Sequence, residues 1–216
     1  MSISNVIIDD LLINIIYLVH LDDLQELSNC NVLLNDIIHE PKFVRKSVPN
    51  NIVSSVNDGN LKEALENSAY YGYLYICEYL VSIGVFDYDD ALLCAARKGH
   101  LKICKYLIEQ GATDLNKALP NASCSGDLKV CEYLVEQGAT NLNESLVSAA
   151  KSDDLDICKY LVSLGATNFN EALSNSAFYG KSGRLKVCKY MREQGAINFD
   201  NALINATNAN KSDIYE

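Results

Sequence analysis

The sequence of 216 residues contains no tryptophan, three prolines and two methionines. Because proline interrupts helices and favours turns, its scarcity favours long helical runs over a loop-rich β-sandwich. Lysine and arginine are absent from residues 1–40, and the whole chain has 18 basic residues against 28 acidic ones, a net charge of −10. Nucleic-acid binding depends on neutralising phosphates with cations, so this balance argues against a nucleic-acid partner.

A long hydrophobic run is also missing. The longest apolar stretch, residues 11–21, is interrupted by Asn14 and His20, and it is shorter than the roughly 20 residues that a membrane-spanning helix needs. The N-terminus has no basic segment in front of an apolar one, so a secretory signal peptide is not expected. With apolar residues at 49% and charged residues at 21%, the composition predicts a soluble, folded chain without a membrane partner.

One local pattern recurs five times between residues 61 and 198. Its centre is a cysteine followed by a charged residue, tyrosine and leucine or methionine, and a glycine stands seven residues after each cysteine. The cysteines are Cys77, Cys104, Cys131, Cys158 and Cys188, in steps of 27, 27, 27 and 30 residues. The recurrence predicts tandem repeats. Their boundaries are 61–87, 88–114, 115–141, 142–168 and 169–198, with a linker over 51–60 and a partial sixth repeat over 199–216.

Each repeat predicts two helices. The second, such as residues 101–110, has apolar residues over a broad face, as in a helix buried between neighbours, and the repeated glycine ends it in a left-handed conformation. The first helix has an Ala-Leu or Ser-Leu step and then small residues, which allow neighbouring helices to approach closely. A polar residue recurs where we expect its N-cap: Asp89, Asn116, Asn143, Asn170 and Asp200. The predicted fold is therefore all-α, a helical solenoid of helix-turn-helix repeats.

The phrase Ala95-Ala-Arg-Lys-Gly-His-Leu-Lys-Ile-Cys-Lys-Tyr-Leu-Ile-Glu-Gln-Gly-Ala112 resembles an ankyrin repeat. The repeats are about six residues shorter than the usual length of about 33, and the Thr-Pro-Leu-His motif is reduced to forms such as Lys117-Ala-Leu-Pro120. The β-hairpin fingers of ankyrin repeats are therefore expected to be absent or rudimentary. This shortened style is similar to ankyrin proteins of large DNA viruses of amoebae. The resemblance implies a protein–protein interaction module.

Residues 1–50 lack the repeat and predict a module of three helices. The Leu11-Leu12 pair, the Leu21-Asp-Asp-Leu24 step and the closing Pro41-Lys-Phe43 resemble an F-box. The sequence departs from that pattern at Ile7-Ile8, where Leu-Pro is usual, at Leu33, where an aromatic residue is usual, and in lacking a terminal tryptophan.

The F-box resemblance implies that residues 5–48 bind the adaptor subunit of a cullin-type ubiquitin ligase. The implied contact residues are Leu11, Leu12, Ile15, Leu24 and Phe43. Two functions stay open. In the first, the chain is the substrate-recruiting subunit of such a ligase. In the second, it is a non-catalytic ankyrin scaffold that binds or sequesters a partner, and residues 1–50 cap the solenoid.

The cysteines do not predict a metal site, a cofactor or a disulfide. No Cys-x-x-Cys pair occurs, and equivalent helices of a stack lie about 8–10 Å apart, whereas a disulfide needs Cα atoms about 4.4–6.8 Å apart. We interpret the repeat cysteines as small buried thiols. Unpaired thiols predict a reducing compartment, the cytoplasm, which for a viral protein is that of the host cell. Since no nucleophile–base pair or glycine-rich phosphate loop is present, no enzymatic activity is expected.

The residues that differ between repeats are the candidates for partner binding. The pair before the glycine of the first helix varies most, and in ankyrin proteins the equivalent pair lines the concave partner-binding face. With Tyr73 the candidate residues are Tyr70, Tyr71, Tyr73, Arg97, Lys98, Cys124, Ser125, Lys151, Ser152, Phe178 and Tyr179. Tyrosine and arginine are common interface anchors, and the basic middle of the row suits an acidic protein target of a monomeric chain. Plain surface variation is the alternative interpretation.

The residue after each repeat cysteine is charged. We interpret this row as a solvated face in which opposite charges on adjacent repeats pair weakly and help to set the register. Its members are Glu78, Lys105, Glu132, Lys159 and Lys189.

Overall fold

The structure, a computed structural model, describes residues 50–57, 59–179 and 184–208. The F-box-like module predicted over residues 1–50, with Leu11, Leu12, Ile15, Leu24 and Phe43, lies outside the described residues except for Asn50. The chain divides into two compact units, an N-terminal unit of residues 1–91 and a C-terminal unit of residues 92–216.

The regular elements of the described residues are all helices, and no strand forms within 50–57, 59–179 or 184–208. The prediction of an all-helical solenoid is therefore confirmed for this part of the chain. The helices are α4 (Asn50–Asn57), α5 (Leu61–Tyr71), α6 (Leu74–Ser82), α7 (Asp89–Arg97), α8 (Leu101–Gln110), α9 (Leu115–Ser125), α10 (Leu128–Glu136), α11 (Leu142–Ser152), α12 (Leu155–Ser163), α13 (Phe169–Tyr179), α14 (Arg184–Glu193) and α15 (Phe199–Asn208).

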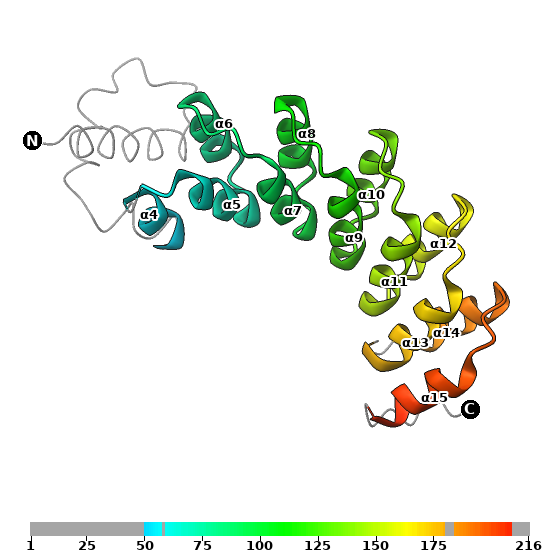
Figure 1. Cartoon of the computed structure of the whole chain (residues 1–216). Coiled ribbons are helices and arrows are strands. Elements are labelled where there is room, and N and C mark those ends of the chain that lie inside the picture. Colours follow the sequence, from blue (N-terminus) through cyan, green and yellow to red (C-terminus); the bar gives the residue numbers. More distant parts are fainter. Residues whose placement is uncertain (1–49, 58, 180–183, 209–216) are drawn as a thin grey trace, which may run out of the picture. The chain divides into compact units, whose positions relative to one another are not determined.

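In the C-terminal unit the helices form two layers. The first helices of the repeats, α9, α11, α13 and α15, lie side by side along one side of the stack, and the second helices, α10, α12 and α14, lie along the other (Figure 1). Each predicted repeat contains one first helix and one second helix. The exact boundaries between repeats remain a prediction, because the structure shows where helices begin and end and not where a repeat begins.

The core of the stack is built from equivalent positions of successive repeats. In α8, for example, Ile103 is 1% exposed, and Cys104 and Leu107 are fully buried. Burying a leucine or isoleucine side chain contributes about 1.5–3 kcal/mol, so each second helix is held by the same three contacts. The equivalent buried residues are Val130, Cys131 and Leu134, Ile157, Cys158 and Leu161, and Val187, Cys188 and Met191.

Left-handed residues end the first helices. The left-handed conformation that the sequence predicted for the glycines after the second helices is also present, for example at Gly111 with a φ of 114°. Gly99 has a φ of 75°, and a Cβ atom there would lie 2.9 Å from the Oδ2 atom of Asp127 in the next repeat. Both the backbone conformation and the close approach of the next repeat favour glycine at this position. Asp153 replaces glycine at the end of α11 and adopts the same conformation with a φ of 67°, which short polar residues tolerate better than others.

The predicted N-cap row is wrong, because Asp89 is the first residue of α7 and the other four are each the second residue of their helices: Asn116, Asn143, Asn170 and Asp200. Helix α11 begins at Leu142 with Asn141 as its N-cap, so Asn143 lies inside the first turn. Asn141 donates from Nδ2 to the Oε2 atom of Glu144 at 2.6 Å. Asn143 instead accepts two hydrogen bonds from backbone N–H groups of the next repeat, those of Thr167 at 2.7 Å and Asn168 at 3.1 Å.

The contact of Asn143 is one step of an asparagine ladder along the C-terminal unit. Asn116 accepts hydrogen bonds from the N–H groups of Thr140 and Asn141 at 2.7 and 3.1 Å. Asn170 accepts from Ile197 and Asn198 at 2.8 and 3.0 Å. Each asparagine therefore holds the loop that precedes the first helix of the next repeat.

In the N-terminal unit, helix α4 has the features of a second helix that precedes the first predicted repeat. The N–H of Asn60 donates to the carbonyl of Ser55 at 2.8 Å, as the N–H of Val85 donates to Leu80 at the end of α6. Gly59 has a φ of 74°, and Ile52, which stands seven residues before this glycine like a repeat cysteine, is fully buried. Residues 51–60, assigned to a linker from the sequence, thus contain most of a helix that packs against α5.

Helix α15 leaves part of its apolar surface exposed. Leu203 stands where Leu119 and Leu146 stand in their repeats, and it is 44% exposed whereas those two are fully buried. Its neighbour Ile204 is 57% exposed. Helix α15 is the last helix of the described residues.

The asparagine ladder makes a stability prediction. Asn143→Ala removes two inter-repeat hydrogen bonds, so we expect it to lower the free energy of unfolding by about 1 kcal/mol in urea denaturation. Asn143→Asp keeps the accepting oxygen and is expected to retain the stability of the parent chain. The matched control is Asn121→Ala, whose side chain bonds only within its own helix, to the carbonyl of Lys117. Equal destabilisation by the two alanine substitutions would show that the ladder does not hold the repeats together.

Candidate functional site

The predicted binding row lies in both units. In the N-terminal unit it consists of three tyrosines around the turn between α5 and α6. Tyr70 and Tyr71 pack edge to face with ring centroids 5.1 Å apart, and Tyr73 packs in the same way on Tyr75 at 5.9 Å. Tyr71 is 44% exposed, and its hydroxyl lies 3.5 Å from the Nδ2 atom of Asn51 in α4.

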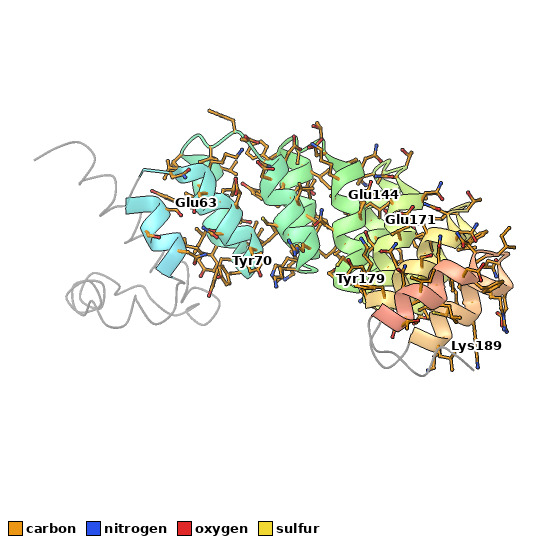
Figure 2. All side chains as sticks on the ribbon, turned by 60° about the horizontal axis from the view of Figure 1, so that its bottom comes forward. Glu63, Tyr70, Glu144, Glu171, Tyr179 and Lys189 are labelled. Carbon is orange, nitrogen blue, oxygen red and sulfur yellow. The ribbon has the colours of Figure 1, made fainter. Side chains whose placement is uncertain are left out.

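In the C-terminal unit two opposite edges of the stack are defined by the helix ends. At the turn edge the first helices end and the second helices begin, and it comprises residues 97–105, 124–132, 151–159, 178–179 and 184–189. At the loop edge the second helices end and the next first helices begin, and it comprises residues 109–117, 136–144, 163–171 and 192–201. Figure 2 shows Tyr179 and Lys189 at one edge, and Glu144 and Glu171 at the other.

All predicted partner-binding residues of the C-terminal unit lie at the turn edge, at or just after the ends of the first helices. The most exposed aromatic residue among them is Tyr179, at 55%. Its ring packs on Phe178 edge to face, with centroids 4.6 Å apart, and the ammonium group of Lys151 from the neighbouring α11 lies 5.6 Å from the centre of its ring. The three side chains form a mixed aromatic and cationic cluster. Such a cluster is typical of residues that anchor a protein partner.

The other predicted partner-binding residues of the C-terminal unit differ in their exposure and in their hydrogen bonds. Arg97, Lys98 and Cys124 are exposed. Ser152 is half-buried and donates to the carbonyl of Ser123 on the preceding first helix at 3.2 Å. Its hydroxyl thus links neighbouring helices. Ser125 is exposed, although its hydroxyl is bonded to a carbonyl of its own helix.

The two edges of the C-terminal unit carry opposite charge. At the turn edge nine described side chains are cationic and five are carboxylates, whereas the loop edge has seven carboxylates and two cations. The nine cationic side chains are all exposed: Arg97, Lys98, Lys102, Lys105, Lys129, Lys151, Lys159, Lys186 and Lys189. A chain with a net charge of −10 thus has a local positive edge.

The sequence analysis missed the part of this edge that belongs to the second helices. Lys102 and Lys129 occupy the second position of α8 and α10. A cation there opposes the helix dipole, whose positive end is the N-terminus, so local helix stability does not account for it. The signal in the sequence was the recurrence of lysine at this unfavourable position. By contrast, Asp127 and Asp154 cap α10 and α12 by accepting from the N–H groups of Val130 and Ile157, so their placement has a structural cause.

The charged residues after the repeat cysteines do not form the ridge of ion pairs that the sequence suggested. Within the described ranges the ion pairs join Lys62 to Asp87 and Asp90, and Lys117 to Asp114. Lys105 instead lies over the ring of Tyr133 on the next second helix, 5.1 Å from its centre.

The repeat cysteines are buried thiols without a disulfide. Burial raises the pKa of Cys104 and of Cys158 to about 12, and that of Cys131 to about 11. Cys188 lies 3.1 Å from the hydroxyl of Ser176 on the first helix of its repeat. A thiol that stays protonated is a poor nucleophile and a poor metal ligand. No cluster of three or more potential metal ligands occurs within the described residues, and none of the described helices is long and apolar enough to cross a membrane.

These observations define a helical repeat protein with a variable, charged turn edge. Residues 65–145 match the sequence profile described as ankyrin repeats (3 copies). The fold is similar to that of the crystal structure of the human ASB11 ankyrin repeat domain, with a TM-score of 0.54 and 24% identity over 66% of this chain and 76% of that one. No curated protein matched the sequence.

The resemblance to ankyrin repeats is therefore confirmed for residues 65–145, and the fold is similar to that of an ankyrin repeat domain. Ankyrin repeats are typically non-catalytic modules for binding other proteins. The resemblances to an F-box and to viral ankyrin proteins stay predictions from the sequence.

The burial of the repeat cysteines predicts a hierarchy of thiol reactivity. At pH 8 we expect iodoacetamide to modify the exposed Cys124 first, and Cys104, Cys131 and Cys158 on the order of a hundredfold more slowly, because these react only when the stack opens. Mass spectrometry of peptides over time measures the rates. Cys124→Ser should remove the fast adduct from residues 97–132. If Cys104 reacts as fast as Cys124, the thiols are not sealed in the helix interface.

Proposed function

We propose that this chain is a non-catalytic adaptor that recruits a protein target to a cullin-type ubiquitin ligase. The ankyrin repeats hold the target, and residues 5–48 bind the adaptor subunit of the ligase. The reduced, buried thiols fit a cytoplasmic protein, in the host cell if the chain is viral. No cofactor takes part in this function.

The observation that supports target binding is the cluster of Tyr179, Phe178 and Lys151 at the turn edge. Tyr179 is 55% exposed although it is large and partly apolar, and a cation of the neighbouring helix lies over its ring. Surface variation alone gives no reason for an aromatic pair and a lysine to gather at successive repeats. Arg97 and Lys98 extend the surface with positive charge, so a target with acidic residues next to an apolar side chain fits it.

The ligase arm of the proposal is supported by sequence resemblance. The Leu11-Leu12 pair, Leu24 and Phe43 supply the apolar contact that an F-box makes with its adaptor. Three short helices bury little surface on their own, so such a module gains stability by binding a partner.

A second candidate function is a scaffold that binds or sequesters a partner without any ligase. The observation that favours it is helix α4, which continues the repeat pattern towards residues 1–49. In this view residues 1–50 cap the solenoid, and their apolar residues pack on the repeats.

The two candidates are separated by affinity purification of three forms of the chain from the cell in which it is made. The forms are the full chain, a deletion of residues 1–48 that keeps α4, and the full chain with Lys151→Ala and Tyr179→Ala. We expect the full chain to bring down both the ligase adaptor and a target, the deletion to lose the adaptor alone, and the double variant to lose at least about tenfold of the target alone, since anchor residues dominate binding.

Thermal unfolding separates the two candidate functions without relying on the capture of a partner protein. If residues 1–48 cap the solenoid, their deletion lowers the melting temperature and broadens the transition of the repeats, and no form brings down the adaptor. Absence of the adaptor from the purified full chain contradicts the ligase proposal. An unchanged yield of target with the double variant contradicts the binding site.

A further inference from the structure

We propose that the second helices of the C-terminal unit provide a row of lysines that binds an extended acidic protein segment lying across the turn edge. The segment crosses α8, α10, α12 and α14 and presents one carboxylate to each helix. This surface lies beside the end of the first helices and adds a charged track to the aromatic cluster. The inference rests on the proposed function in one respect, that the ligand is a protein.

The lysines of the turn edge lie near the N-terminal ends of the second helices. Each of the four second helices has at least one exposed lysine within its first six residues, and no acidic residue stands in the first turn of α8, α10 or α14. Helix dipoles favour carboxylates at the N-terminal end of a helix, so cations at that end do not stabilise the folded chain. The lysines and the dipoles attract anions to the turn edge, most strongly at α8 and α14, because the capping carboxylates of Asp127 and Asp154 offset part of the positive charge at α10 and α12.

The lysines form two rows across the second helices, and each row has a lysine where the other has a carboxylate. The row nearer the helix starts reads Lys102, Lys129, Asp156 and Lys186, and the row one turn further reads Lys105, Glu132, Lys159 and Lys189. Each row is interrupted by one carboxylate, and the interruptions fall on different helices. An extended segment that shifts by one helical turn therefore meets a lysine on every helix.

The spacing of the stack sets the spacing of the ligand. Packed helices lie about 8–10 Å apart, and an extended chain advances about 3.3 Å per residue. Successive lysines are therefore matched by acidic residues about three positions apart, and four helices are spanned by about ten residues. A segment with acidic residues at every third position fits the surface, and a contiguous acidic run leaves most lysines without a partner.

The charge pattern favours a protein segment over a nucleic acid or a second copy of the chain. A phosphate backbone is uniformly negative, so it would pass Asp156 and Glu132 at close range, whereas a protein segment can place neutral residues there. The loop edge of a second copy is acidic, but its carboxylates are fixed on helices, and two chains of net charge −10 repel each other.

The test uses the full chain and fluorescent decapeptides in an anisotropy titration at low salt. The spaced peptide is Glu-Ser-Thr-Glu-Ser-Thr-Glu-Ser-Thr-Glu, and the clustered peptide has the same composition with its four glutamates in a row. We expect the spaced peptide to bind about fivefold or more tightly than the clustered one, with an affinity that falls as salt rises. A ten-residue oligodeoxythymidylate is the nucleic-acid probe, and it should bind more weakly than the spaced peptide.

The variant combines Lys102→Gln, Lys129→Gln, Lys159→Gln and Lys186→Gln, one exposed lysine on each second helix. We expect it to weaken binding of the spaced peptide about tenfold or more, with an unchanged or raised melting temperature because cations leave the helix N-termini. The matched control is Lys117→Gln, at the loop edge, which should leave binding unchanged.

Several results overturn the inference. They are equal binding of the spaced and clustered peptides, unchanged binding by the quadruple variant, tighter binding of the oligonucleotide, and self-association of the parent chain in sedimentation that the quadruple variant abolishes. If the peptides fail while Lys151→Ala and Tyr179→Ala still reduce target capture, the lysine track is wrong and the proposed function stands. If Lys151→Ala and Tyr179→Ala also leave target capture unchanged, both the lysine track and the proposed function are contradicted.

Discussion

The repeated burial of three side chains from each second helix is the contact on which the rest of the structure depends. Ile157, Cys158 and Leu161 are fully buried in α12, and the equivalent residues are buried in the helices on either side. Cysteine suits the middle position as a small apolar side chain in a close-packed interface. With the packing fixed in this way, the same helix end recurs at the same edge of the stack in every repeat of the C-terminal unit.

Because the packing is regular, the helix ends of successive repeats line up and form continuous surfaces. The loop edge is used internally, since its asparagines bind the backbone of the following loop, as Asn143 does with Thr167 and Asn168. The turn edge forms fewer contacts of this kind between repeats. Its residues vary from the Arg97-Lys98 pair to the Phe178-Tyr179 pair. The loops therefore hold the stack, and the variable surface lies at the ends of the first helices.

Much of this fold followed from the sequence, because the cysteine step, the glycines and the small residues of the first helices are local signals with one structural interpretation. The asparagine ladder did not follow, since Asn143 bonds to a neighbouring repeat and a sequence shows only that a polar residue lies near a helix start. Helix α4 was missed because Ile52 stands in place of the cysteine that marks the other repeats. The lysines that the second helices add to the turn edge did not follow either, because helix ends group residues that lie 27 positions apart in the sequence.

Site-specific photo-cross-linking in an extract of the source cell tests most directly whether the turn edge is the binding surface. A benzophenone side chain is placed at position 179 on the turn edge, and at position 171 on the loop edge of the same helix, α13. The account predicts that position 179 forms an adduct with one protein, identified by mass spectrometry, and that position 171 forms none with that protein. An adduct with the same protein from position 171 in equal yield, or no adduct from position 179, would contradict it.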